Sequence, residues 1–191
     1  IAEKNGLTII KPYDAMETIF GQGTTALEAI KQTPSSFDVA LICAGGGGLT
    51  AGCSIIFNHH NPDIQIFTTE PEEWNDQERS YASGTIQTAS ASASGLCDGL
   101  LTPEPGEIPF SINLTLGIQG LSCEEQYIFD AMQLAKEAFA VELEPSGAIA
   151  LANLIKHKDK FQEKNVFLTF SGGNVDPEVF NECLAEAKLG L

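Results

Sequence analysis

Positively charged side chains are scarce in this chain of 191 residues. Ten lysines and arginines stand against 26 aspartates and glutamates, which gives a formal net charge of −16 at pH 7. A surface this negative repels phosphate backbones and anionic headgroups, which argues against nucleic acid and membranes as partners. Because Arg79 is the only arginine, a bound anion has to be held mainly by backbone N–H groups.

Paired cysteines and targeting signals are missing as well. The five cysteines form no CxxC pair, and their odd number and apolar neighbours predict free thiols in a reducing cytoplasm rather than a zinc site. The first residues contain no apolar segment of the kind that a signal peptide has. They also lack an initiator methionine, so we expect the chain to be part of a longer one.

Charge is absent from residues 39–58, a run whose length alone would fit a membrane span. Five glycines interrupt the run, and its order is apolar strand, glycine loop and helix. That order is typical of a buried α/β core, so we expect no transmembrane segment here.

Short apolar strands alternate with helical patterns along the chain, and a hydrophobic share of 43% is enough for a packed core. Because the strands are continuously apolar, we expect an α/β fold with a parallel twisted sheet flanked by helices on both faces. Residues 85–97, rich in serine, alanine and threonine, predict a loop, with low complexity as the alternative. The strands are expected at residues 7–10, 39–43, 64–69 and 166–170, and the helices at residues 14 (or 23)–31, 49–59, 124–139, 146–156 and 177–188.

Four consecutive glycines, residues 45–48, separate a predicted strand from the helix that follows it. In such a loop the backbone N–H groups at the helix start converge on a small anion, normally a phosphate. A dinucleotide-binding turn is one alternative, because Glu70 ends the next strand, although the glycines are contiguous and not spaced as GxGxxG. Another is that the glycines only allow tight packing of helix on strand.

Ser171 follows the last predicted strand, at the edge where parallel α/β sheets usually bind ligands. Its hydroxyl can donate a hydrogen bond to a neutral ring nitrogen, or it can simply cap the turn. Residues 21–24, Gly-Gln-Gly-Thr, predict a glycine-hinged entry into a helix and carry little functional information alone.

Glu70 and Asp76 lie six residues apart in an acidic segment. Two carboxylates with free backbone carbonyls between them can supply the oxygen ligands that Mg²⁺ or Ca²⁺ prefers. The alternative is an acidic loop that is merely solvated.

Together these segments resemble the fold-type II pyridoxal-phosphate enzymes, in particular their serine/threonine dehydratase and serine racemase branch. The resemblance implies a tryptophan-synthase-β-like fold in which residues 1–191 form the C-terminal, larger, phosphate-binding domain, incomplete and without the small domain. It rests on the following residues, which occur in the family's order: Pro12-Tyr13-Asp14, Gly21-Gln22-Gly23-Thr24, Gly45-Gly46-Gly47-Gly48-Leu49, Glu70-Pro71, Asp98-Gly99, Glu144-Pro145-Ser146-Gly147-Ala148 and Ser171-Gly172-Gly173-Asn174.

The resemblance also implies roles for individual residues. Ser171 would hydrogen-bond the pyridine nitrogen of pyridoxal 5′-phosphate, and Glu144 would lie near the cofactor, with an interaction with the helix dipole as its alternative role. The phosphate would be held by Gly45, Gly46, Gly47, Gly48 and the N–H of Leu49.

The metal-dependent members of the family bind a divalent cation with a glutamate, a carbonyl and an aspartate. The matching positions here are Glu70, the carbonyl of Trp74 and Asp76, which would hold Mg²⁺ or Ca²⁺.

The family's Schiff-base lysine lies in a Ser-x-Lys-x-Arg-Gly segment, and none of the nine lysines has that context. We therefore expect no catalytic residue in this chain and no activity from it alone. The intact protein would be a cytoplasmic homodimer that converts L-threonine or L-serine to a 2-oxo acid and ammonia. The alternatives are a serine racemase, a hydroxyaspartate dehydratase and a non-catalytic pyridoxal-phosphate-binding module.

Overall fold

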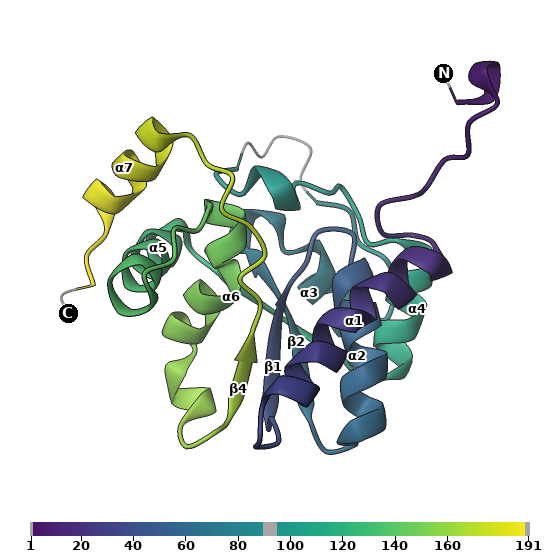
Figure 1. Ribbon diagram of the computed structural model, residues 1–191, viewed down its shortest axis with the longest axis horizontal. Helices are drawn as coiled ribbons and strands as arrows, with labels where there is room; N and C mark the ends of the chain where they lie inside the picture. The colour runs from purple at the N-terminus through teal and green to yellow at the C-terminus, as the bar shows by residue number, and fades with distance from the viewer. Residues whose placement is uncertain (1, 90–94, 190–191) are drawn as a thin grey trace.

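Four strands form one parallel sheet in the computed structural model, which describes residues 2–89 and 95–189 (Figure 1). The strand order is β3-β2-β1-β4, and all three pairings are parallel. The carboxyl ends of the strands therefore share one edge of the sheet, and the predicted parallel α/β fold is confirmed. The strands are β1 (Val39–Cys43), β2 (Gln65–Pro71), β3 (Gln119–Cys123) and β4 (Val166–Leu168).

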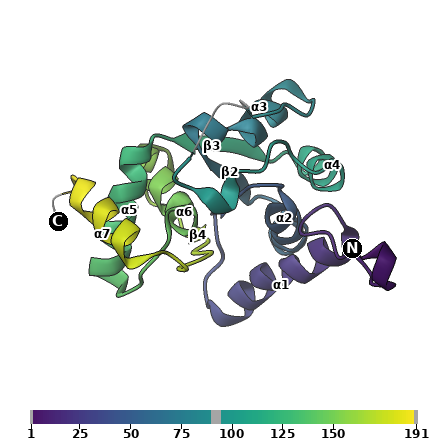
Figure 2. The same cartoon turned by 90° about the horizontal axis from the view of Figure 1, so that it is seen from above.

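Helices cover both faces of this sheet (Figure 2). On one face α6 contacts β1, β2 and β3, with α5 packed on α6 and α7 on α5. On the other face α2 contacts β1 and β2 and is covered in turn by α1 and α4. The helices are α1 (Met16–Gln32), α2 (Gly48–His60), α3 (Asp76–Ser83), α4 (Glu107–Thr115), α5 (Glu125–Phe139), α6 (Pro145–Lys156) and α7 (Pro177–Glu186).

The alternation of side chains along β1 explains why this strand is continuously apolar. Ala40 and Ile42 belong to the core beneath α2, whereas Val39 and Leu41 belong to the core beneath α6. All four are fully buried, because a strand covered by helices on both sides exposes neither face to water.

Two glycines allow α1 and α2 to cross closely. A Cβ on Gly23 would lie 2.8 Å from the backbone oxygen of Gly52, and a Cβ on Gly52 would overlap the backbone of α1 at Ile19. The predicted glycine-hinged entry at residues 21–24 is therefore wrong, since these residues lie inside α1, where Gly23 serves the packing on α2.

The expected strand at residues 7–10 is also wrong. These residues have neither helix nor strand structure, and Leu7, Ile9 and Ile10 are 62, 74 and 82% exposed. An apolar segment forms a strand only where a neighbour accepts and donates its backbone hydrogen bonds, and the described residues provide none here.

Other differences concern short elements. β4 has three residues and is only half-buried, because it lies at the edge of the sheet and not in its centre. The helices α3 and α4 and the strand β3 were not expected at all. Residues 85–89 and 95–97 form neither helix nor strand, in line with the expected loop, whereas residues 90–94 of that segment lie outside the described residues.

All five cysteines lie in the described part of the chain, where each is free, as the sequence predicted, and each is also buried. None of the helices in the described ranges combines the length and apolar composition that crossing a bilayer requires.

Candidate functional site

A cavity of about 420 Å³ opens at the edge of the sheet where the strands end. Its walls come from the loop after β1, the start of α2, the segment before α1, residues 99–102, the start of α6 and the loop after β4. The seven residues predicted to contact a cofactor all line it: Gly45, Gly46, Gly47, Gly48, Leu49, Glu144 and Ser171.

The glycine loop leaves no room for side chains. A Cβ on Gly45 would lie 2.8 Å from Oγ1 of Thr102, and a Cβ on Gly48 would lie 2.9 Å from Cα of Tyr13. Gly47 is the N-cap of α2 with a φ of +85°, a conformation that favours glycine. The loop therefore brings bare backbone to the positive end of the α2 dipole, where an anion is stabilised.

Glu144 lies in the opposite wall of the cavity and is hydrogen-bonded to the loop that follows β4. Its Oε2 accepts a hydrogen bond from the backbone N–H of Asn174 at 2.9 Å, and its own N–H donates to the carbonyl of Gly172 at 3.1 Å. The carboxylate makes no capping bond to α6, although Glu144 is the N-cap residue of that helix. Glu144 thus holds the loop that carries Ser171 to the cavity.

Cys43 also lines the cavity, and the sequence reasoning did not single it out. It is the last residue of β1, directly before the glycine loop, and its backbone N–H donates to Oγ1 of Thr169 at 3.0 Å. Burial raises the pKa of the Cys43 thiol, while a hydrogen bond with the Ser171 side chain works in the other direction. At neutral pH this side chain is a thiol, so it adds no charge beside Ser171.

The carboxylate of Glu70 is 1% exposed and does not belong to a solvated loop. Glu70 lies in β2, and its two oxygens accept the backbone N–H groups of Gln77 and Glu78 at 2.9 and 2.8 Å, which fixes the start of α3. Burial, and secondarily the nearby charge of Asp76, raises the pKa of Glu70 well above its usual value. The solvated-loop alternative is therefore wrong for this residue.

Asp76 begins α3 and is 2% exposed. Burial raises its pKa to about 7, and its Oδ2 has no hydrogen-bond partner within the described residues. A buried carboxylate oxygen without a partner is costly and is an oxygen of the kind that Mg²⁺ or Ca²⁺ prefers, whereas both oxygens of Glu70 already accept backbone N–H groups. No group of three histidine, cysteine, aspartate or glutamate side chains in the described ranges is arranged to hold a metal. A cation here would therefore depend on these two carboxylates and the carbonyl of Trp74.

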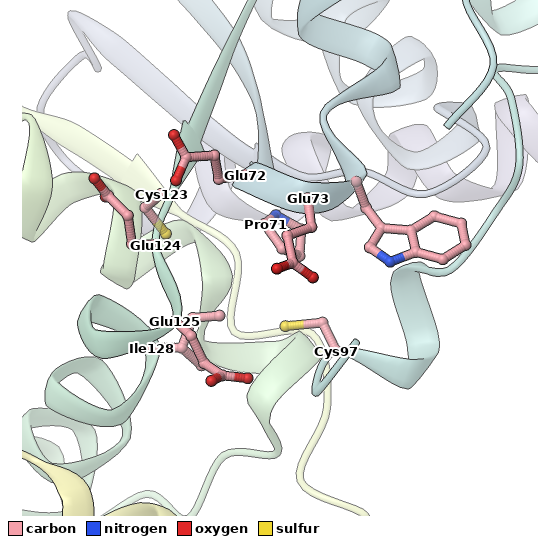
Figure 3. Close-up of a pocket in the computed structure, with 9 residues that line it drawn as sticks. Pro71, Glu72, Glu73, Cys97, Cys123, Glu124, Glu125 and Ile128 are labelled. Carbon is pink, nitrogen blue, oxygen red and sulfur yellow. The ribbon is translucent and has the colours of Figure 1, made fainter. Parts of the chain in front are cut away.

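A smaller pocket of about 160 Å³ lies beside residues 71–74 (Figure 3). It shares no lining residue with the larger cavity at residues 45–49, the glycine cavity. Glu72, Glu73, Glu124 and Glu125 surround it. Lys156 pairs with Glu124 at 2.8 Å but leaves an excess of negative charge. The pocket thus repels anions, which separates it chemically from the glycine cavity.

Comparison with known proteins gives the following matches. Residues 1–172 match the family described as "Pyridoxal-phosphate dependent enzyme". Serine racemase of Schizosaccharomyces pombe is 31% identical over 186 residues, which are 97% of this chain and 57% of that protein. L-threo-3-hydroxyaspartate ammonia-lyase of Saccharomyces cerevisiae is 32% identical over 176 residues, 92% of this chain and 53% of that protein.

Among solved structures, the processed form of threonine deaminase isoform 2 from Solanum lycopersicum has a TM-score of 0.91 at 27% identity. The match covers 98% of this chain and 55% of that one. The chain thus spans about half the length of the relatives it matches.

Proposed function

Because the chain belongs to the pyridoxal-phosphate dependent enzyme family, we propose that the glycine cavity binds pyridoxal 5′-phosphate in an ammonia-lyase. The substrates would be L-threonine and L-serine, and the products a 2-oxo acid and ammonia. One observation carries the proposal: all seven residues expected to contact the cofactor, drawn from three distant stretches of sequence, line a single cavity.

The glycine loop would hold the phosphate. The residues from Gly45 to Leu49 offer backbone N–H groups at the N-terminus of α2, and a Cβ at Gly45 or Gly48 would not fit. Uncharged backbone donors are needed for the phosphate because the chain has a single arginine. That residue, Arg79, is hydrogen-bonded elsewhere, to Asn75 and to the carbonyl of Thr88. Backbone dipoles can therefore bind the dianion without a basic side chain.

The hydroxyl group of Ser171 would donate a hydrogen bond to the pyridine nitrogen. When bound, the cofactor supplies an electron sink for negative charge at the substrate Cα. A hydroxyl does not protonate the nitrogen as a carboxylic acid would, so the sink is weaker and favours loss of a β-hydroxyl over transamination. Glu144 would keep this hydroxyl in place through its bond to Asn174.

A divalent cation, Mg²⁺ or Ca²⁺, would bind at Glu70, the carbonyl of Trp74 and Asp76. The unpartnered Oδ2 of Asp76 and the raised pKa values that burial gives both carboxylates support this, because a cation would relieve their desolvation. Its role would be structural, since these residues do not line the glycine cavity.

No lysine is among the described residues that line the cavity. The reaction needs one, so we propose that a segment outside these 191 residues supplies the Schiff-base lysine, together with a small domain that closes over the substrate. In this proposal residues 1–191 are the large domain, and the intact protein is a cytoplasmic homodimer.

Related activities on the same scaffold remain the alternatives, since relatives include a serine racemase and a hydroxyaspartate ammonia-lyase. The second carboxylate of hydroxyaspartate calls for a cationic partner, and Arg79 does not line the described cavity. The choice between hydroxyaspartate and substrates with neutral side chains therefore rests on the segment outside these 191 residues. The other alternative is a module that binds the cofactor without catalysis.

The test is an assay of the full-length protein with its cofactor. We expect 2-oxo acid formation from L-threonine and L-serine, more than from L-threo-3-hydroxyaspartate, and little D-serine. D-serine as the main product would identify a racemase instead. Cofactor binding without any turnover would leave the binding module, and no cofactor binding would overturn the proposal.

A further inference from the structure

Three buried polar side chains lie behind the glycine loop and do not line the cavity. Gln77 and Tyr81 come from α3, and Asn113 comes from α4. Gln77 and Asn113 are fully buried, and Tyr81 is 9% exposed. Buried polar groups are costly unless they are hydrogen-bonded, so their partners indicate what they are for.

These side chains connect two carbonyls of the loop. Gln77 Nε2 donates to the carbonyl of Gly45 at 2.5 Å, and the Tyr81 hydroxyl donates to Gln77 Oε1 at 2.6 Å. Asn113 Nδ2 donates to the Tyr81 oxygen at 3.0 Å and, at the longer distance of 3.5 Å, to the carbonyl of Gly47. The network thus runs from one glycine carbonyl through three side chains to another.

The carbonyl of Gly46, between those of Gly45 and Gly47, also accepts a hydrogen bond. The oxygen of Gly46 accepts the backbone N–H of Gly106, the N-cap of α4, at 3.0 Å. The oxygens of Gly45 and Gly46 are therefore bound from the side of α3 and α4. The oxygen of Gly47 accepts the backbone N–H of Ala51 at 2.9 Å within α2, and Asn113 adds only the longer contact to it. In a trans peptide the N–H points opposite to the C=O. Holding the oxygens of Gly45 and Gly46 therefore directs the N–H groups of Gly46 and Gly47 away from α3 and α4.

We propose that Gln77, Tyr81 and Asn113 are positioning residues that preorganise the glycine loop for the cofactor's phosphate. This rests on the proposed function, because it takes the loop as the phosphate site. Glycine has more backbone freedom than any other residue, and a run of four has no side chains of its own to hold it. The network fixes the donor directions before binding, so less ordering has to accompany it.

The chemistry of the network suits an anion site in an acidic chain. All three side chains are neutral, so they place no negative charge beneath a phosphate. Burial raises the pKa of the Tyr81 hydroxyl, which keeps it protonated and donating at neutral pH. The backbone N–H of Gln77 is bound to Glu70, and the Tyr81 ring stacks on Phe110, so the backbone of Gln77 and the ring of Tyr81 are both anchored independently of the loop.

The test compares affinities for pyridoxal 5′-phosphate and pyridoxal in the full-length protein freed of cofactor. The ratio of the two dissociation constants isolates the contribution of the phosphate. Tyr81→Phe keeps the stacked ring and removes one link, and Gln77→Met keeps the side-chain length and removes the donor to Gly45. The matched control is Gln126→Met, because Gln126 bonds Asp130 and the carbonyl of Glu186, and it does not line the cavity.

We expect Gln77→Met to lower the affinity for pyridoxal 5′-phosphate about three- to tenfold, with Tyr81→Phe at the lower end of that range. Pyridoxal affinity should not change, and the ³¹P resonance of the bound phosphate should shift. Gln126→Met should match the wild type in its affinities for both ligands and in its ³¹P resonance. If Gln77→Met fails to fold, Tyr81→Phe decides the outcome.

Three results would overturn the inference. The first is a wild type that prefers the phosphorylated ligand and variants that keep both of its affinities. This result would remove the positioning role and leave the proposed function standing. Equal losses for both ligands would indicate general damage to the fold. A wild type that binds both ligands equally would overturn the phosphate site itself, and the positioning role with it.

Discussion

The carboxylate of Glu144, at the start of α6, accepts the backbone N–H of Asn174 at 2.9 Å, in the loop that follows β4. This bond ties the loop that carries Ser171 to a helix covering one face of the sheet. The glycine loop on the other side of the cavity is tied to α3 and α4. Each wall of the cavity therefore has its own support, and each can be tested separately.

Glu144→Ala should destabilise the loop of Ser171. Loss of this charge-assisted bond should lower the free energy of unfolding by about 1 kcal/mol, since the site is partly exposed. Glu144→Gln keeps an oxygen acceptor and should lose less. Urea denaturation measures both, and equal stability of the alanine variant and the wild type would contradict the assigned contact.

Two glycines of α1 should respond oppositely to alanine. A Cβ on Gly21 would meet no neighbouring element of the described chain within 4 Å, so Gly21→Ala should stabilise the protein by about 0.5–1 kcal/mol through helix propensity. Gly23→Ala should destabilise it, because the new methyl would lie 2.8 Å from the oxygen of Gly52. Thermal unfolding of the two variants measures both effects, and each variant serves as the control for the other. A change in stability of the same sign in both variants would contradict the close crossing of α1 and α2.

Mg²⁺ or Ca²⁺ should raise the melting temperature if Glu70 and Asp76 bind it. At a hundred times the dissociation constant the added stability is about 2.7 kcal/mol. Asp76→Asn should abolish the shift, whereas Glu73→Gln, which changes an exposed neighbour, should keep it. A melting curve that does not respond to millimolar metal would argue against the site.

The metal response should also depend on pH. Burial raises the pKa of Asp76 to about 7, so a proton competes with the cation below that pH. The metal-induced shift should therefore be larger at pH 8 than at pH 6. The same shift at both values would show that Asp76 is not a ligand.

Without metal, the same carboxyl makes stability fall as pH rises. Its folded pKa of about 7 lies above the ordinary value of 3.8, so the folded state retains a proton that the unfolded state has lost between these values. The free energy of unfolding should decrease across this window. Asp76→Asn should flatten that part of the profile, measured by urea denaturation in the presence of a chelator. An unaltered profile would assign the pH dependence to other groups.

The sequence predicted the segments whose environment is local. β1, the glycine loop and α2 were predicted to within a residue, because a continuous apolar strand, four glycines and a helix follow one another directly. The clustering of Ser171 with that loop follows from the parallel sheet, which collects strand ends at one edge. Glu144 lies between α5 and α6 and follows no strand, so its expected place rested on the family resemblance alone. The contact that holds Glu144 to Asn174 required the structure.

The sequence analysis did not predict secondary-structure elements whose buried positions are polar residues or glycine. The helix α3 buries Asp76, Gln77 and Ser80, so its sequence has no apolar stripe. β3 begins with glutamine and glycine, and a Cβ on Gly120 would overlap the backbone of Glu78. These polar and glycine positions are explained only by partners far away in the sequence. The network behind the glycine loop was missed for the same reason.

The extended segment before α1 has a consequence for handling the chain. Leu7, Ile9 and Ile10 expose apolar side chains on a stretch of backbone without a strand partner among the described residues. Such a stretch is a template for β-pairing between copies, and its apolar side chains would stabilise the pairing. We therefore expect these three residues, which do not line the cavity, to lower the concentration up to which the 191-residue chain stays monodisperse, and charged substitutions there to raise it.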